Sequence, residues 1–324
     1  MNEASVIAMI ARHFPPRPQL YPLGIGDDTA ILKAQLGLDL LTCDCMCEGV
    51  HFDFRWMGWG DVAYRCLSAN ISDIAAMGGE PGPFVLSLAL PGHSPSVQDL
   101  EALFGGLRAC VDEHHCQDLY LLGGDTVRSS GGLMLSITLL GRAPSGGAVR
   151  RSTARLGDKL VVFRPLGGAA LGLELLRRGL HGRAPLFERE HRRPMAETSL
   201  GVALGQSGLL SAMMDLSDGL VQDLERLSAA SGLRLRLEVD AIPRHPLLTS
   251  LCQELGLDER DFVLAGGEDY TLVATVPVEG LEALGVLLRR EGREAYVIGE
   301  AFALGEGVDV GAFERRGFEH FDSA

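Results

Sequence analysis

The run Leu41-Thr42-Cys43-Asp44-Cys45-Met46-Cys47-Glu48 guides the interpretation of this 324-residue chain. Apolar Leu40 leads into it and Gly49 follows it, as is typical of a β-strand. Side chains on a strand alternate between its two faces, so the three cysteines point one way. The hydroxyl, the methionine and the two carboxylates point the other way. The run therefore predicts a strand with one small, apolar face and one face rich in oxygen ligands.

The cysteines of this strand admit two interpretations. Cys43, Cys45 and Cys47 could form a soft-metal site, or they could be small buried residues. Tetrahedral thiolate sites usually use C-x-x-C turns, and no second Cys/His pair is nearby, so we favour buried residues. The total of seven cysteines is odd and lacks paired spacing, which suits reduced thiols in a reducing compartment.

Length and composition indicate a two-domain globular protein. The segment from Ala143 to Arg155 is rich in Gly, Ser and Arg without apolar periodicity, so we expect domains over residues 1–145 and 146–324. There is no long uncharged apolar run to span a membrane, and Met1 to Ser5 do not resemble the start of a signal peptide. We therefore expect a cytoplasmic protein with no membrane partner.

The chain is acidic, with a formal net charge of −14. Its basic clusters, such as Arg150-Arg151 and Arg192-Arg193, are short and isolated, whereas a nucleic-acid surface needs a sustained basic face. We expect no nucleic-acid partner. If the ligand is a polyphosphate, divalent metal must supply much of the positive charge.

Acidic residues recur beside glycine or serine in the N-terminal half. Gly24-Ile25-Gly26-Asp27-Asp28 could form an Asx turn into a strand, but a hard cation would relieve the repulsion between the adjacent carboxylates. Asp73 lies inside a predicted helix, where Asp is a poor helix former, and is either solvated or a ligand. Gly123-Gly124-Asp125 follows the predicted strand 119–122, which would put a carboxylate on a loop at the sheet rim.

The C-terminal half repeats this theme. Asp215 and Asp218 bracket Ser217 at a predicted helix start, where carboxylates also serve as plain N-caps. Gly266-Gly267-Glu268-Asp269 precedes a strand. The turn Gly167-Gly168 is only a weak phosphate-binding signal, because it lacks the Lys and Ser/Thr of a P-loop.

The remaining periodicity predicts alternating helices and strands. We predict helices over residues 4–14, 62–77, 96–113, 169–178 and 221–230, strands over 84–90, 119–122, 133–140, 159–163 and 233–239, and a charged, Pro-bounded loop over 182–194.

Taken together and in this order, the motifs Gly24–Asp28, Thr42–Asp44 with Glu48–Phe52, Asn70–Gly78, Gly123–Thr126, Asp215–Leu220 and Gly266–Tyr270 resemble the thiamine-monophosphate kinases. That family belongs to the ATP-binding superfamily of aminoimidazole ribonucleotide synthetase and selenophosphate synthetase. The resemblance runs nearly the whole length. It implies a mixed α/β fold of two domains: an N-terminal mixed sheet with helices that binds ATP and Mg²⁺ and dimerises, and a C-terminal α/β sandwich that completes the active site.

The resemblance also implies a reaction and a set of site residues. The reaction would be ATP-dependent phosphorylation of thiamine monophosphate to thiamine diphosphate in a homodimer, the last step of thiamine diphosphate biosynthesis. The ligands of several Mg²⁺ ions would be Asp28, Thr42, Asp44, Asp73, Asp125, Asp215 and Asp218. ATP contacts would be Gly124, Asp125, Arg151 and Ser217, and substrate contacts would be His51 and Glu268. The need for a monovalent cation stays open.

Two positions depart from the family pattern. Cys43 stands where the family usually has Thr, so a hydroxyl ligand is either lost or replaced by a backbone contact. Arg315 stands near the place of an aromatic residue that commonly packs on the substrate. Two rivals remain: a related enzyme that phosphorylates another acceptor, and a nucleotide-binding regulator without catalysis.

Overall fold

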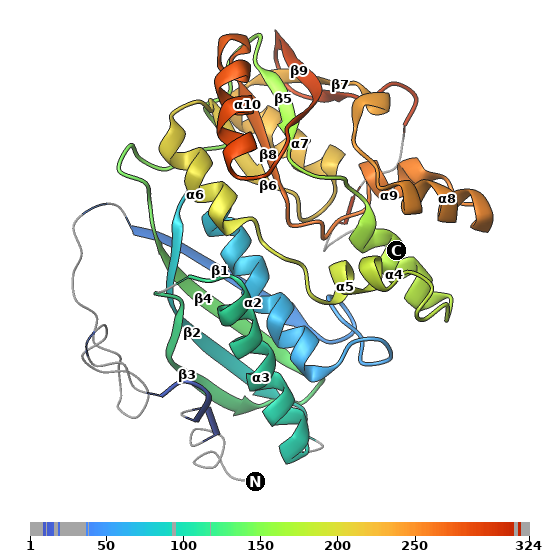
Figure 1. The fold of residues 1–324 in the computed structure, drawn as a ribbon. Coiled ribbons are helices and arrows are strands. Elements are labelled where there is room, and N and C mark those ends of the chain that lie inside the picture. The colour runs from blue at the N-terminus through green and yellow to red at the C-terminus, as the bar shows by residue number, and fades with distance from the viewer. Residues whose placement is uncertain are drawn as a thin grey trace. The chain divides into compact units, whose positions relative to one another are not determined.

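The computed structural model describes residues 9–10, 12–15, 19, 37, 39–92, 95–116, 118–313 and 317–318 (Figure 1). The chain divides into two compact units, residues 1–74 with 79–145 and residues 75–78 with 146–324. Asp28 and Arg315 lie outside the described residues, as does most of the predicted helix 4–14.

The N-terminal unit is built on a four-stranded mixed sheet with the strand order β1-β4-β2-β3. The strands are β1 (Asp39–Cys47), β2 (Glu80–Leu90), β3 (Tyr120–Arg128) and β4 (Met134–Arg142). β4 pairs antiparallel with β1 and β2, whereas β2 and β3 are parallel. The predicted strand 41–48 is thus confirmed as β1, which is an outer strand among the four described strands of this sheet.

Two helices, α2 (Trp59–Ala76) and α3 (Val97–Glu113), cover one face of this sheet (Figure 1). The strand residues that point toward them are buried and apolar, among them Leu86 and Ile137, which are directly paired. Ser96 caps α3 in a capping box with Asp99. α2 begins at Trp59, three residues before the predicted start, and Asp61 lies in its first turn.

The predicted end of β3 at residue 122 is wrong, because β3 continues through the Gly-Gly-Asp motif to Arg128. Asp125 is paired with Ser87 on β2 instead of lying on a loop. Gly124 allows this pairing, because a Cβ built there would lie 1.8 Å from the Leu86 carbonyl oxygen. Gly124 therefore serves close strand pairing and not chain reversal.

The C-terminal unit is built on a six-stranded mixed sheet with the order β10-β7-β9-β5-β8-β6. Its strands are β5 (Lys159–Val162), β6 (Ala212–Asp215), β7 (Leu233–Leu237), β8 (Leu272–Val276), β9 (Tyr296–Leu304) and β10 (Val308–Asp309). Its helices are α4 (Gly168–Arg177), α5 (Pro185–Arg192), α6 (Thr198–Ser207), α7 (Leu220–Ser231), α8 (Pro246–Leu255), α9 (Glu259–Leu264) and α10 (Leu281–Arg290), with 3₁₀ turns η1 (Val239–Ala241) and η2 (Val278–Gly280).

Both faces of this sheet carry an apolar core. Leu160 and Val162 of β5 point into a cluster with α4, α5, α7 and α8. Val161, between them, points into a second cluster with α6 and α10. This arrangement is the predicted α/β sandwich, and it explains why the short strands are apolar on both faces.

The predicted loop over residues 182–194 is wrong, because residues 185–192 form α5. Pro185 occupies the first turn, where its missing N–H costs nothing. Phe187 and His191, one helical turn apart, are both buried. With these two positions buried among charged neighbours, the apolar period was too weak to see in the sequence.

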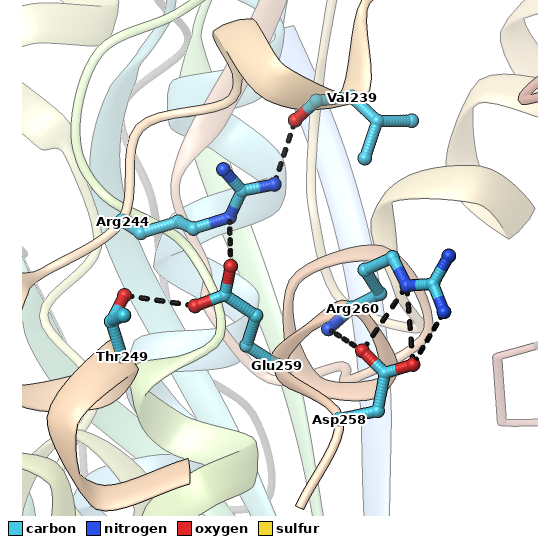
Figure 2. A network of polar contacts seen from close by, with 6 residues as sticks. All are labelled: Val239, Arg244, Thr249, Asp258, Glu259 and Arg260. Carbon is cyan, nitrogen blue, oxygen red and sulfur yellow. Dashed lines mark hydrogen bonds and ion pairs between the residues drawn. The ribbon is translucent and has the colours of Figure 1, made fainter. Parts of the chain in front are cut away.

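A polar network holds α8 and α9 together (Figure 2). The Glu259 carboxylate accepts a 2.8 Å hydrogen bond from Thr249 Oγ1 and lies 3.4 Å from Arg244 Nε. Arg244 also donates to the carbonyl of Val239, at 2.8 Å. Asp258 caps α9 by accepting from the backbone N–H of Arg260. The network anchors the helix that leads into the Gly-Gly-Glu-Asp segment.

Candidate active site

Two of the predicted metal ligands of the N-terminal unit meet directly. The Thr42 hydroxyl on β1 donates a hydrogen bond to the Asp73 carboxylate on α2. Both residues are half-buried. Asp73 therefore faces the strand, which excludes the simple solvated helix face that the sequence left open.

Asp44 lies two residues after Thr42 on the same face of β1. Its backbone N–H donates to Asn70 Oδ1 at 3.1 Å, and Asn70 Nδ2 donates to the Cys66 carbonyl at 2.9 Å. Asn70 is fully buried. This amide joins β1 to α2 and so brings the oxygen ligands of Thr42, Asp44 and Asp73 onto one patch, defined here as the β1/α2 patch.

His51 is held in a tight turn after β1. Its Nδ1 accepts a 3.0 Å hydrogen bond from the backbone N–H of Cys47. A neutral imidazole that accepts at Nδ1 carries its proton on Nε2. His51 is thus a hydrogen-bond donor at Nε2, which suits contact with a phosphate oxygen better than proton abstraction.

Asp125 does not join the β1/α2 patch within one chain. Across the sheet, Cys45 pairs with Ser136, Ser136 with Ser87, and Ser87 with Asp125. Paired residues share a face, so Asp125 points to the same side as Cys45, opposite to Asp44. Three strand spacings, about 14 Å, also separate β1 from β3.

The cysteines of β1 lie on this second face. Cys43 and Cys45 are exposed in the chain, so their interpretation as buried residues is wrong here. Cys43 Sγ accepts from Thr138 Oγ1 at 3.4 Å. The Cys43 thiol therefore points away from Thr42 and Asp44, and only its backbone could join their oxygens.

In the C-terminal unit, the segment after β6 is organised by a buried carboxylate. Asp223 on α7 accepts hydrogen bonds from the backbone N–H groups of Ser217, at 2.9 Å, and Asp218, at 3.0 Å. Arg226 Nη1 contacts both the Asp223 carboxylate, at 2.7 Å, and the Asp218 carboxylate, at 2.6 Å. The Asp218 carboxylate is therefore not a plain N-cap but half of an ion pair.

Asp223 is fully buried, and burial raises its pKa to about 6. Sequence reasoning missed this residue and Arg226. Their positions in the first two turns of α7 were the available signal, because an acid that follows a Ser-Asp-Gly turn can reach back to its N–H groups. Asp215, at the end of β6, is half-buried beside this segment.

The Gly-Gly-Glu-Asp segment is clamped against the same turn. The N–H of Glu268 donates to the Ser217 carbonyl at 2.7 Å, and the N–H of Tyr270 donates to the Leu216 carbonyl at 2.8 Å. Glu268 has a φ of 72°, a left-handed conformation that is unusual for a residue with a side chain. Such strained backbone is common at ligand-binding positions.

The side chain of Asp269, unlike that of Glu268, is buried within the C-terminal unit. Its carboxylate accepts from the Gly167 N–H at 3.0 and 3.1 Å, and its carbonyl accepts from Arg164. Burial raises the pKa of Asp269 to about 7, and the charge of Arg164 opposes part of that rise. The Gly167-Gly168 turn thus binds a carboxylate of its own chain.

Arg151 lies on an exposed turn of the C-terminal unit, where its carbonyl accepts a 2.7 Å hydrogen bond from Ser231. The hydrogen bond fixes the backbone of Arg151. The role of its side chain in ATP binding stays a prediction.

The β1/α2 patch has the chemistry of a magnesium site: one hydroxyl and two carboxylates, all hard oxygen ligands. Across the part of the chain that is described, no three His, Cys, Asp or Glu side chains are close enough together to hold a metal ion. The two acids of the patch are thus a partial ligand set, which phosphate oxygens and further residues would complete.

Comparison with known proteins decides the family. A model for the AIR synthase related protein, N-terminal domain, matches residues 26–143, and the corresponding C-terminal domain model matches residues 155–310. The chain is 35% identical over 311 residues to a thiamine-monophosphate kinase of Salmonella typhimurium, covering 92% of this chain and 91% of that protein. The chain belongs to the thiamine-monophosphate kinase family.

Other members of the thiamine-monophosphate kinase family are similar to this chain over most of its length. A Bacillus subtilis member is 33% identical, covering 81% of this chain and 80% of that protein. The crystal structure of the Stenotrophomonas maltophilia K279a enzyme superposes with a TM-score of 0.83 at 33% identity, covering 97% of this chain and 98% of that one. A structure described as "AaThiL complexed with AMPPCP and TMP" has a TM-score of 0.78 at 30% identity, covering 98% and 97%. The predicted family and fold class are confirmed.

No helix in the described ranges is both long and apolar enough to cross a membrane.

Proposed function

We propose that this chain transfers the terminal phosphoryl group of ATP to thiamine monophosphate, giving thiamine diphosphate and ADP, the last step of thiamine diphosphate biosynthesis. The observation that carries this proposal is full-length similarity to thiamine-monophosphate kinases together with the oxygen ligands of the β1/α2 patch. A relative has been solved with AMPPCP and TMP.

Magnesium fits the residues present. Thr42, Asp44 and Asp73 would hold Mg²⁺ on the N-terminal unit, and Asp215 and Asp218 would hold Mg²⁺ on the C-terminal unit. Bound Mg²⁺ would neutralise phosphate charge and align the reacting groups. The acidic chain, with a net charge of −14, needs such cations to accept a triphosphate.

The protein's own groups would position the reactants. The acceptor phosphate is already ionised at neutral pH, so the reaction needs no strong general base. His51 would donate from Nε2 to a phosphate oxygen, because its Nδ1 accepts from the backbone of Cys47. Glu268 would bind the cationic thiazolium or the aminopyrimidine of thiamine. Gly124, Asp125, Arg151 and Ser217 would contact ATP.

We infer a homodimer from the position of Asp125. Asp44 and Asp125 lie on opposite outer strands and opposite faces of one sheet, too far apart to share an ion. If both bind the same metal–nucleotide complex, one of them comes from a second copy.

The test is a coupled assay with purified protein, ATP, Mg²⁺ and thiamine monophosphate, with thiamine diphosphate quantified directly. Formation of ADP and thiamine diphosphate in equal amounts supports the proposal. ADP without thiamine diphosphate indicates a different acceptor, and nucleotide binding without turnover indicates a non-catalytic regulator. Either result overturns it.

A further inference from the structure

We propose that His191 is a positioning residue that fixes the Glu268 carboxylate toward the cationic or N–H-donating ring of the acceptor substrate. This inference rests on the proposed function and assigns a role to α5. His191 Nδ1 lies 3.0 Å from Glu268 Oε2. His191 lies near the end of α5, and Glu268 lies in the segment between α9 and β8 of the same C-terminal unit.

Burial differs sharply between the two partners. The His191 side chain is 3% exposed, whereas the Glu268 side chain is 28% exposed. The imidazole is thus the fixed partner, held within the unit, and the carboxylate is the partner that a ligand can reach. A ligand that approaches from solvent therefore meets the carboxylate and not the imidazole.

The backbone of Glu268 is already held in place. Its N–H donates to Ser217, and the neighbouring Asp269 is anchored by Gly167 and Arg164. The Glu268 side chain itself is flexible, and the contact with His191 restrains its carboxylate. A carboxylate ordered before binding loses less conformational freedom when the ligand arrives.

The pair also selects the chemistry of the ligand. An ionised carboxylate only accepts hydrogen bonds, so it favours cations and N–H donors and disfavours anions. The thiazolium cation and the exocyclic amine of thiamine both meet this requirement, whereas the phosphate end does not. The pair would therefore orient the ring end of the substrate away from the phosphates.

The experiment compares His191→Leu, His191→Asn and His191→Gln by steady-state kinetics and calorimetric binding of thiamine monophosphate. An Asn amide nitrogen can take the place of Nδ1, whereas a Gln amide nitrogen lies nearer the place of Nε2. We expect His191→Leu and His191→Gln to raise KM and Kd for thiamine monophosphate about tenfold or more, the effect of losing a hydrogen bond to a charged group. KM for ATP should stay constant, and His191→Asn should restore much of the affinity.

Phe187→Leu is the matched control, because Phe187 is buried one turn earlier on α5. It should lower the thermal midpoint without changing KM for thiamine monophosphate. An unchanged KM in folded His191→Leu, or equal increases for both substrates in all variants, would overturn the inference. If the wild-type protein does not convert thiamine monophosphate, the proposed function itself has failed. If it does, only the role of His191 is in question.

Discussion

Asp44 and Asp125 lie on opposite faces of the same four-stranded sheet, on its two outer strands. No single metal ion can bind both carboxylates of one chain across about 14 Å of sheet. This relationship ties the proposed metal site to the oligomeric state, and it gives the dimer a test that does not depend on measuring molecular mass.

Mixed dimers provide this test. We expect Asp44→Asn and Asp125→Asn each to be inactive alone. When the two variants are unfolded, mixed equally and refolded together, half of the dimers are mixed, and each of these has one intact site. Activity should return to about a quarter of the wild-type value. If both residues act within one chain, the mixture stays inactive.

Asp44→Asn should by itself abolish turnover while folding is retained. The substitution keeps the size of the side chain and the backbone N–H that donates to Asn70, but it removes the charge that holds a hard cation. We expect kcat to fall by about 100-fold or more. The thermal midpoint should change little. Near-normal turnover in this variant would contradict the metal role.

Substitution by alanine should lower the stability of the protein at Gly124 but not at Gly123. A Cβ at Gly124 would lie 1.8 Å from the Leu86 carbonyl oxygen, whereas nothing lies within 4 Å of a Cβ at Gly123. We expect Gly124→Ala to separate β2 from β3 and to lower the free energy of unfolding by about 2 kcal/mol or more. Gly123→Ala should leave it almost unchanged. Chemical denaturation curves of the two variants would check this, and equal stability would contradict the observed strand pairing.

The sequence predicted the main elements of the fold because its patterns are local. The alternation in β1 extends over fewer than ten residues, so it can be recognised without knowledge of distant partners. The mid-helix position of Asp73 left a solvated face and a ligand as alternatives, and its contact with Thr42 decides against the solvated face.

Other features depend on partners distant in sequence, and the pattern could not reveal them. β3 has a glycine at residue 124 because Leu86, on another strand, approaches its backbone there. α5 reads as a charged loop because only two of its apolar or aromatic positions are buried, and one of these is a histidine paired with Glu268. The separation of Asp44 from Asp125 required the strand order.

Asp269 should make the stability of the protein depend on pH. Its pKa rises from an ordinary value near 4 to about 7 when the chain folds, so the folded state binds a proton that the unfolded state has released. The stabilisation is complete below about pH 4 and is lost as the pH rises toward about 7. Denaturation between pH 4 and 7 should show this slope, and Asp269→Asn should flatten it. The same slope in the variant would mean that another group titrates.

Asp223→Ala should lower the stability of the protein and raise the Mg²⁺ concentration that the reaction needs. The fully buried carboxylate accepts two backbone N–H groups and pairs with Arg226, so its removal leaves buried donors unsatisfied. We expect the free energy of unfolding to fall by about 1–3 kcal/mol. The Mg²⁺ concentration for half-maximal rate should also rise, because the segment that carries Asp218 loses its anchor.

Glu225→Ala is the matched control for this variant, since Glu225 is an exposed acid on the same helix. It removes the same charge and leaves the Ser217-Asp218 turn intact, so both quantities should stay near wild type. Thermal denaturation and Mg²⁺ titration of the two variants separate a local effect from a change in net charge. Equal changes of the thermal midpoint and of the Mg²⁺ requirement in both variants would show that the overall charge of α7, and not the buried contact of Asp223, determines the Mg²⁺ requirement.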